Sequence, residues 1–439
     1  MAIEALSWME HEGLSERAAF ARAAKQLQIT GTDQLRIAQM LVLETTRRRN
    51  FIDYLIERVA GGHSNLSSMP HGLMSFLRMF CYWTKFREMR RGDIVRILRA
   101  ARSALGWMDL HPIELVFGRI LAIDPAEAVA ELTSDRTLAL TLFHPAWFAS
   151  SAGVLLGRSG AVKLMRRNLR PALSYIRINT LRGNEEKCLR EIEREGIEVK
   201  PVEHLPFTFQ VISSKRPIPR TEAYRRGRVT IQDKASILAS VVAAPRPGDL
   251  VLDVCAAPGA KTAHLAELMQ NKGAICSIDR SALRMSLLRR EMPRLGVEIV
   301  HPLLADASKP LAMKMDADVA VVDPPCSNTG TFWKTPSVKW RVTPERTARL
   351  AATQSAMLEN ASRLVRVGGT LLYSTCTILP EENEQVVTRF LRLNPDFQAV
   401  DSVPKIGMPG LYGSDTSQRL YPHVHDCNGH FLSKMRRTG

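Results

Sequence analysis

Apolar and polar residues follow a different pattern in each of three consecutive parts of the chain. Up to about residue 135, apolar side chains recur every three or four positions, which is the period of an amphipathic helix. The clearest helical stretches cover residues 34–59, 72–82 and 94–105. The pattern therefore predicts an all-helical domain over residues 1–135.

The second part, residues 140–229, begins with a helical pattern and then changes to strand-like runs. The predicted elements are a helix within residues 141–169, a strand at 174–179, a charged helix at 184–195 and a strand at 207–212. Strands and a helix in this order favour a small α/β domain in which the helix packs on an antiparallel sheet.

The third part, residues 230–439, alternates short apolar runs with amphipathic stretches. The predicted strands cover residues 250–254, 274–279, 299–304, 319–323, 370–374 and 429–434. The predicted helices cover residues 262–270, 281–295, 346–365 and 381–393. Such alternation is typical of a doubly wound, mostly parallel sheet, so the expected fold class of this part is α/β.

The loop after the first strand of the third part has the composition of a nucleotide-cofactor site. It reads Asp253-Val-Cys-Ala-Ala-Pro-Gly-Ala-Lys-Thr262. Small side chains let the backbone approach a ligand, and the following helix offers free N–H groups. The second strand ends in Asp279, where an acid accepts hydrogen bonds from ribose hydroxyls, and the third ends near Asp306, which can accept from an adenine amino group. The loop and the two acids predict a nucleoside pocket.

The spacing of the glycines narrows the choice of cofactor. Neither G-x-G-x-x-G nor G-K-[ST] is present, which argues against a dinucleotide and against a nucleotide triphosphate. S-adenosylmethionine is the best candidate, and Lys261 would then reach its carboxylate. The predicted cofactor-binding residues are Cys255, Ala256, Ala257, Pro258, Gly259, Ala260, Lys261, Asp279, Asp306 and Asp323.

Two later strands each end close to a cysteine. Asp323-Pro-Pro-Cys326 follows the run at 319–322, and Ser374-Thr-Cys376 follows the run at 370–373. Ligands of open α/β sheets bind beyond the carboxyl ends of the strands, so the two thiols and the cofactor loop are expected to face one pocket. The other cysteines are expected to be small packing residues. They are Cys81, Cys188, Cys255, Cys276 and Cys427.

A resemblance to the RNA (cytosine-5)-methyltransferase family, which includes the Sun/Fmu rRNA enzymes and nucleolar relatives, rests on three motifs. They are Cys255-Ala-Ala-Pro-Gly-Ala-Lys-Thr262, Asp323-Pro-Pro-Cys-Ser-Asn-Thr-Gly330 and Thr375-Cys-Thr-Ile-Leu-Pro-Glu-Glu-Asn383. The likeness covers residues 140–439, and the N-terminal helices more faintly resemble a NusB-like RNA-binding domain. Ala260 departs from the family, which usually has a second glycine there.

The resemblance implies a fold, a reaction and a role for each thiol. The implied fold is a Rossmann-like methyltransferase domain over 230–439, preceded by an RRM-like domain and by the helical NusB-like domain. The implied reaction is the methylation of carbon 5 of a cytosine in rRNA or tRNA. Carbon 5 is a weak nucleophile until a thiolate adds at carbon 6, which is covalent catalysis. The family pattern makes Cys376 the attacking thiol, while Cys326 assists product release and Asp323 contacts the base.

Two other functions are less favoured, because the Thr375-Cys376 motif opposes a DNA enzyme and intact Asp323, Cys326 and Cys376 oppose a silent factor. A DNA cytosine methyltransferase would attack with the Pro-Cys thiol, here Cys326. A catalytically silent RNA-binding assembly factor would keep the fold without needing Asp323, Cys326 and Cys376. Asn328 and Lys334, in the loop beyond Pro-Pro-Cys, are expected to face the RNA. Glu381 and Glu382 are expected to complement the dipole of the helix at 381–393.

The charge of the chain indicates a polyanionic partner. The formal net charge is +16 and the isoelectric point is about 9.8, which favours RNA binding with a strong dependence on salt. Candidate phosphate contacts in the second part are Arg166, Arg167, Arg225, Arg226 and Arg228.

The cysteines and the hydropathy pattern set the remaining expectations. Seven scattered cysteines with no C-x-x-C pair predict neither a disulfide framework nor a zinc finger, so no metal is expected. A zinc site built from Cys255, Cys326 and Cys376 would lack the short ligand spacing of known sites. With no run of 18 apolar residues and no signal-peptide layout, the expected protein is a cytoplasmic monomer without a membrane partner.

Overall fold

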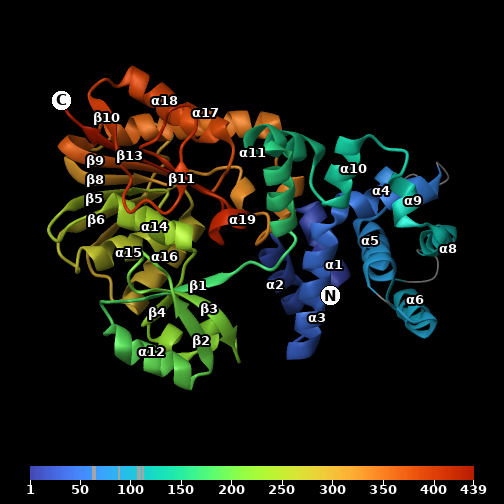
Figure 1. The fold of residues 1–439 in the computed structure, drawn as a ribbon. Coiled ribbons are helices and arrows are strands. Elements are labelled where there is room, and N and C mark those ends of the chain that lie inside the picture. Colours follow the sequence, from blue (N-terminus) through green and yellow to red (C-terminus); the bar gives the residue numbers. More distant parts are fainter. Residues whose placement is uncertain (62–65, 88, 106–109, 111–112) are drawn as a thin grey trace. The chain divides into compact units, whose positions relative to one another are not determined.

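The computed structural model describes residues 1–61, 66–87, 89–105, 110 and 113–439 (Figure 1). The chain divides into two compact units. The first comprises Met1–Arg170 together with Phe332–Arg341, and the second comprises Pro171–Thr331 together with Val342–Gly439. A ten-residue segment of the C-terminal half is thus part of the N-terminal, helical unit.

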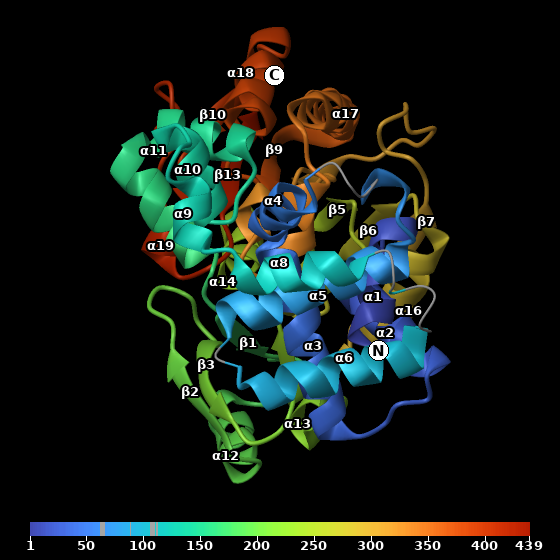
Figure 2. The ribbon, with the colours of Figure 1, turned by 90° about the vertical axis from the view of Figure 1, so that its right-hand side faces the viewer.

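The helical unit is built from helices (Figure 2), and its hydrophobic core contains several aromatic rings. Its helices are α1 (Ala2–His11), α2 (Glu16–Gln26), α3 (Thr32–Arg47), α4 (Arg49–Ala60), α5 (His71–Phe86), α6 (Arg91–Leu105), α8 (Glu114–Ala122), α9 (Pro125–Val129), α10 (Ser134–Thr141) and α11 (Ala146–Arg167), with a 3-10 turn η1 (Leu66–Ser68). The rings of Phe80 and Phe117 lie 4.9 Å apart, and Phe76 packs on both. The helical character predicted for residues 1–135 is confirmed, but the helix predicted within residues 141–169 as part of the second domain is α11 of this unit, whose N-terminal part extends to Arg170.

One predicted helix, over residues 34–59, is two helices in the structure. Arg48 has φ −107° and ψ 11°, which ends α3 before α4 begins. The apolar spacing continues through both helices and therefore does not reveal the break. Two β-branched residues, Thr45 and Thr46, weaken the last turn of α3.

The segment Phe332–Arg341 completes the helical unit by binding the C-terminal end of α3. The last carbonyls of a helix have no partner within the helix. The Lys339 side-chain nitrogen, which is 0% exposed, donates to the carbonyl of Arg47 at 3.2 Å, and the Trp340 indole N–H donates to the carbonyl of Thr46 at 2.7 Å. Lys339 also donates to the carbonyl of Phe143 at 2.9 Å. Two side chains from the C-terminal half therefore cap a helix of the N-terminal half.

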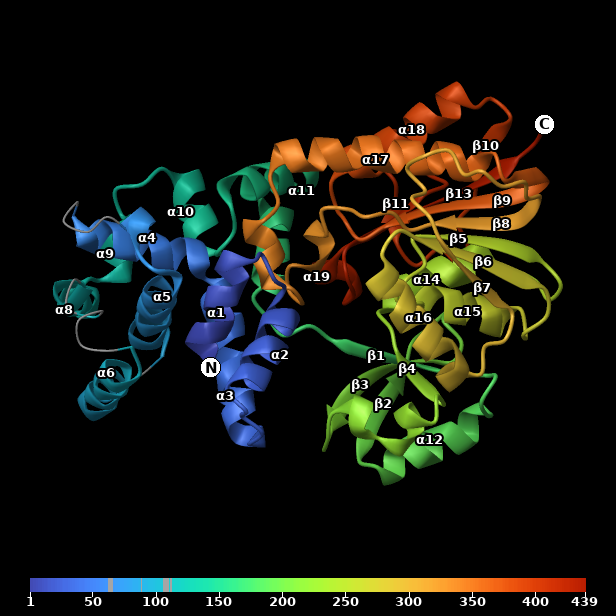
Figure 3. The ribbon, with the colours of Figure 1, turned by 180° about the vertical axis from the view of Figure 1, so that it is seen from behind.

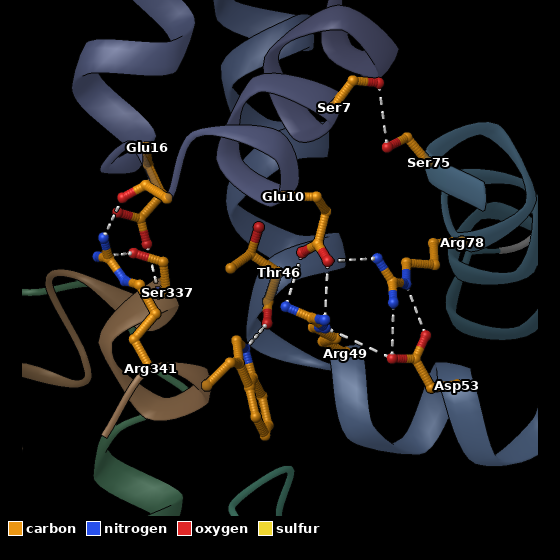
Figure 4. A network of polar contacts seen from close by, with 12 residues as sticks. Ser7, Glu10, Glu16, Thr46, Arg49, Asp53, Ser75, Arg78, Ser337 and Arg341 are labelled. Carbon is orange, nitrogen blue, oxygen red and sulfur yellow. Dashed lines mark hydrogen bonds and ion pairs between the residues drawn. The ribbon is translucent and has the colours of Figure 1, made fainter. Parts of the chain in front are cut away.

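A network of charged side chains links α1, α4 and α5 in the same unit (Figure 4). Arg78 donates two hydrogen bonds to the carboxylate of Asp53, at 2.6 and 3.0 Å. Arg49 donates to Glu10 at 2.9 Å. Bidentate arginine–carboxylate pairs fix the orientation of both partners, so the network sets how these helices pack.

No single described helix is long and apolar enough to cross a membrane. One pair, Ser134–Thr141 with Ala146–Arg167, passes the test of length and composition together, although it is bent by 104°. The second of these helices is itself interrupted at Gly157, where φ is 67°.

The second unit begins with a small sheet carrying one helix. Four strands pair in the order β2-β3-β1-β4, all antiparallel. The elements are β1 (Ser174–Ile178), α12 (Glu185–Arg194), β2 (Ile197–Pro201), β3 (Thr208–Ser214), η3 (Ile218–Arg220), α13 (Glu222–Arg225) and β4 (Val229–Ile231). The predicted packing of a helix on an antiparallel sheet is confirmed, while β2 and the three-residue strand β4 were not predicted.

The rest of the second unit, from residue 234 on, contains the large sheet (Figure 3). Its strands are β5 (Leu250–Val254), β6 (Ala274–Asp279), β7 (Val300–Leu304), β8 (Ala317–Val322), β9 (Val365–Thr375), β10 (Phe397–Val400), β11 (Met408–Pro409), β12 (Gln418–Leu420) and β13 (His430–Arg437). The order is β11-β12-β13-β9-β8-β5-β6-β7, with β10 also paired to β13. Strands β5 to β9 are parallel and β13 is antiparallel to β9, which confirms the predicted doubly wound α/β fold.

Helices cover both faces of the large sheet. They are α14 (Lys234–Ala243), α15 (Ala260–Leu268), α16 (Ala282–Leu295), α17 (Pro344–Ser362), α18 (Glu384–Leu393) and α19 (Pro422–His425). Successive strand residues point to opposite faces. Val251 accordingly packs with α14, α15 and α16, whereas Leu252 packs with α17 and α18. Because β5 and β8 are neighbours at the point where the strand order reverses, a ligand is expected beyond their carboxyl ends.

A buried ion pair joins the small sheet to α15, in the part of the second unit that contains the large sheet. Arg177 of β1 is 1% exposed and pairs with Glu267 of α15. Its Nε also donates to Gln232 at 3.1 Å. The two sheets of the second unit are therefore tied together at a position that excludes water.

Candidate active site

The predicted cofactor loop forms a tight turn between β5 and α15. Gly259 has φ +105°, and a Cβ there would lie 2.8 Å from Met292 Cε, so only glycine fits. Ala260 is the first residue of α15 and has no positive φ, so its methyl group is accommodated. The departure from the family's second glycine thus leaves the turn unchanged.

Asp279 orients this loop through its carboxylate. One oxygen accepts from the Ala257 backbone N–H at 3.2 Å and the other from the Ser281 N–H at 2.9 Å. The Arg284 guanidinium lies 3.6 Å from the same carboxylate. The acid at the end of β6 therefore contacts the loop after β5, as neighbouring parallel strands require.

A pocket of about 380 Å³ opens beside the loop. Among the predicted cofactor residues, Cys255, Asp279 and Asp306 line it. The other lining residues are Ile278, Arg280, Arg284, Ala305, Ala307, Pro325 and Met357. The hydroxyl and backbone N–H of Ser308 hydrogen-bond to Asp306 and lower the pKa of its carboxyl group. Two carboxyl side chains and several apolar walls suit a nucleoside, so the residues present fit an adenosine-containing cofactor.

Lys261 lies outside that pocket and pairs with Asp323. Its ammonium is 2.7 Å from Asp323 Oδ2. Burial alone would lower the pKa of Lys261, but the charge and hydrogen bond of Asp323 outweigh it and the net shift is upward. The lysine therefore remains charged beside the carboxylate that follows β8.

Asp253, at the end of β5, is a further buried acid in the loop. Its Oδ2 accepts from the Thr262 hydroxyl at 2.6 Å, while Oδ1 has no hydrogen-bond partner among the described residues. Burial raises the pKa of this carboxyl to about 7. Sequence reasoning used Asp253 only to mark the strand end and did not single it out as a site residue.

The two predicted thiols meet at the carboxyl ends of β8 and β9. The sulfur atoms of Cys326 and Cys376 are 3.2 Å apart. Cys376 also donates to Asn328 Oδ1 at 2.7 Å. The hydrogen bond to Cys376, together with burial, raises the pKa of Cys326 well above its ordinary value, so Cys326 is a neutral thiol near pH 7.

Glu382 lies beneath the two cysteine loops. The prediction that it complements the helix dipole is wrong, because α18 begins at Glu384 and Glu382 belongs to the 3-10 turn η6 (Pro380–Glu382). Its carboxylate accepts from the Ser327 backbone N–H and from Gln354 Nε2, both at 2.8 Å. Burial raises the pKa of Glu382. This one side chain thus connects the segment after Cys326 to the segment after Cys376.

Several hydroxyls and one imidazole complete the site. Thr377 joins the two cysteine loops through Ser327 at 2.9 Å and Thr329 at 2.8 Å. On the other side, Ser374 lies 3.0 Å from His430 Nε2. Burial lowers the pKa of His430 to about 3, so its ring is neutral.

The remaining sequence predictions fall into two groups. Asn328 contacts both cysteine residues, and Lys334 belongs to the segment incorporated in the helical unit. That these two residues face RNA stays a prediction. Cys81, Cys188 and Cys427 are buried, and Cys276 is partly buried. In the described part of the chain, no group of three or more His, Cys, Asp or Glu side chains is arranged to bind a metal ion.

A doubly wound sheet with a nucleoside pocket, a Lys–Asp pair and two adjacent thiols at its switch point defines a class of methyltransferase. The family described as 16S rRNA methyltransferase RsmB/F matches residues 240–436, and the ferredoxin-like domain of RsmF/B-like methyltransferases matches residues 144–215. The chain belongs to this family of RNA (cytosine-C5)-methyltransferases.

Individual relatives and solved structures agree with this assignment. The probable ribosomal RNA small subunit methyltransferase B of Bacillus subtilis is 34% identical over 69% of this chain and 68% of the relative. The probable ribosomal RNA small subunit methyltransferase B of Synechocystis is 28% identical over 96% of this chain and 95% of the relative. The crystal structure of PH0851 matches 99% of this chain and 98% of its own with a TM-score of 0.87 at 28% identity. The crystal structure of NSun6 from Pyrococcus horikoshii with SFG matches 67% of this chain and 98% of its own, with a TM-score of 0.62 at 25% identity.

Proposed function

We propose that this protein methylates carbon 5 of a cytosine in ribosomal RNA through a covalent bond between Cys376 and carbon 6 of the base. The observation that carries the proposal is the pair of thiols 3.2 Å apart beside the Lys261–Asp323 pair. Ribosomal RNA is favoured because the relatives named as rRNA methyltransferase B match over 68% and 95% of their length, against 54% for a tRNA (cytosine(72)-C(5))-methyltransferase.

The cofactor proposed for this reaction is S-adenosylmethionine, which supplies an electrophilic methyl group when it is bound. Asp279 and Asp306 line the nucleoside pocket and would accept hydrogen bonds from the ribose hydroxyls and the adenine amino group. The backbone of the loop after β5 approaches closely because its residues are small. The fit rests on the size and the acidity of the pocket.

The two thiols differ in ways that support different roles. Cys376 is the less buried of the two, and it lies close enough to the charged Lys261 for the two side chains to interact electrostatically. A Cys376 thiolate adds to carbon 6, and the electron pair moves to carbon 5, which then accepts the methyl group. After a base removes the carbon 5 proton, the carbon–sulfur bond breaks and the thiolate leaves. Cys326 stays protonated and assists this release, while Asp323 contacts the ring and stabilises the charge that develops there.

The activity is tested by methyl transfer to RNA. Purified protein is incubated with labelled S-adenosylmethionine and small-subunit ribosomal RNA from cells that lack the gene. Label in 5-methylcytosine, with one protected cytosine after bisulfite sequencing, is the expected result. Absence of transfer to this unmodified RNA, with the protein folded and cofactor bound, would overturn the proposed activity.

Replacing Asp279 with alanine is expected to weaken cofactor binding by about 1–3 kcal/mol, because a hydrogen bond to the ribose is lost and two loop N–H groups lose their acceptor. Calorimetric titration measures the change. Asp279→Asn keeps one acceptor and should lose less, and Asp316→Ala, at an exposed position away from the pocket, should lose nothing. An unchanged affinity in Asp279→Ala would remove this residue from the site.

A further inference from the structure

Five arginines line one open pocket in the second unit. Its volume is about 720 Å³, and every lining residue is an arginine. The residues are Arg182, Arg225, Arg226, Arg228 and Arg294. They come from three places in the chain: the loop between β1 and α12, the end of α13 with the turn after it, and the C-terminal turn of α16. Guanidinium groups repel one another, so their convergence requires a framework.

The framework is a close backbone contact. Gly227 has φ +69°, and a Cβ there would lie 2.0 Å from the carbonyl oxygen of Arg294. The buried amide of Asn179 donates to the carbonyls of Gly227 and Leu295, at 2.8 and 2.7 Å. The turn after α13 and the end of α16 are therefore locked together, which brings their arginines to one pocket.

The carboxylates around the pocket do not neutralise it. Glu222 pairs with Arg226, Glu191 with Arg228 and Glu291 with Arg294. Among the described residues, neither Arg182 nor Arg225 forms an ion pair with a carboxylate, although Arg182 donates to the carbonyl of Pro293 at 2.6 Å. Five cations and three anions leave an excess of positive charge, which favours an anionic ligand.

One of the guanidinium groups is held in a fixed orientation. Arg294 lies 4.2 Å from the centre of the Tyr224 ring and also donates to the Tyr224 carbonyl. A planar guanidinium with a fixed direction matches the oxygens of a phosphate group better than a mobile lysine does. Among the described residues, no aromatic or carboxylate side chain lines the pocket, so it lacks groups that would stack on a base or accept hydrogen bonds from one.

We propose that this five-arginine pocket binds the phosphodiester backbone of the RNA substrate. The proposal rests on the proposed function, because it takes the anion to be the RNA that the enzyme methylates. Contacts to phosphates position a nucleic acid without reading its sequence. The pocket would then supply affinity that is independent of sequence and decreases with salt, since each phosphate contact releases counterions.

The test compares a double variant, Arg182→Gln with Arg225→Gln, with the wild-type protein. Neither substitution leaves a carboxylate unpaired, and Arg225→Gln alone removes no hydrogen bond that the structure records. RNA affinity is measured by fluorescence anisotropy over a range of salt concentrations. We expect a loss of roughly tenfold for each arginine that contacts phosphate. The slope of log affinity against log salt should become shallower by about 0.7–0.9 for each lost contact.

Two controls make the outcome specific. Arg389→Gln with Arg392→Gln, at exposed positions of α18, removes the same charge outside the pocket and should change the slope less. S-adenosylmethionine affinity, measured alongside, should be equal in all variants. An unchanged salt slope in the double variant would overturn the proposal.

Two further arms separate this proposal from its alternatives. Inorganic phosphate is added at constant ionic strength, and the change in melting temperature is measured for each protein. We expect the change for the wild type to be no larger than the change for the double variant. A larger effect on the wild type, with unchanged RNA binding, would identify a free-phosphate site and overturn the proposal. If the wild type binds RNA with the expected slope difference but transfers no methyl group, the proposed activity fails while the pocket assignment stands.

Discussion

Cys326→Ala is expected to accumulate a covalent protein–RNA species that survives denaturing electrophoresis, whereas Cys376→Ser is expected to form none and to lose methylation. In the proposed reaction Cys376 makes the bond to carbon 6, and a serine hydroxyl is far less nucleophilic at neutral pH. Cys326 acts only after methyl transfer. Its removal leaves addition and transfer intact and stalls the release of product.

The two substitutions should leave the structure of the site unchanged, so their effects on the reaction can be compared directly. The loops that carry the two thiols are joined by Glu382, which accepts from Ser327, and by Thr377. Neither connection passes through a cysteine sulfur, so both variants should keep the fold. Circular dichroism and cofactor binding check this. An adduct that formed in Cys376→Ser and not in Cys326→Ala would exchange the roles of the thiols and favour a DNA-type arrangement.

Arg177→Met is expected to lower the free energy of unfolding by about 3–5 kcal/mol, because it leaves the Glu267 carboxylate buried without a cation. Urea denaturation measures the change. Replacing an arginine at an exposed position of the same domain, as in Arg220→Met, should change stability by less than about 0.5 kcal/mol.

A double variant tests the physical reason for that loss. Arg177 Nη2 and Glu267 Oε1 have no hydrogen-bond partner among the described residues, so the ion pair is incompletely satisfied. Replacing both partners with apolar residues, as in Arg177→Met with Glu267→Leu, should therefore recover most of the lost stability. A double variant as unstable as the single one would show that packing around Arg177, and not the unpaired charge, is responsible.

The sequence predicted the catalytic sheet well because its signal is local. Strands such as β5, β6 and β8 are short apolar runs bounded by turn residues, and the positions of Asp279 at the end of β6 and of Asp323 directly after β8 follow from those runs. The helix α14 was missed for a related reason. In the chain it follows the last strand of the small sheet and precedes the first strand of the large sheet. It is apolar on nearly all sides, so it shows no amphipathic period.

The parts of the site that were not predicted depend on contacts distant in sequence. Asn328 contacts a thiol 48 positions away, and Gln354 and Glu382 meet across 28 positions. No spacing rule connects such residues. A polar side chain in a loop is most often exposed, so the burial of Glu382 could be recognised only once the strands that bring the loops together were known.

The capping of α3 by Lys339 and Trp340 bears on the order in which this protein can fold during synthesis. When residues 1–170 have left the ribosome, the carbonyls of Thr46 and Arg47 still lack the donors that they have in the finished protein. Those donors are translated about two-fifths of the chain later. N-terminal domains commonly fold first as synthesis proceeds. Here the helical unit remains incomplete until the chain has been made as far as Trp340, which comes after β8 and before β9 of the large sheet, so the helical unit cannot complete its folding before much of the second unit has been synthesised.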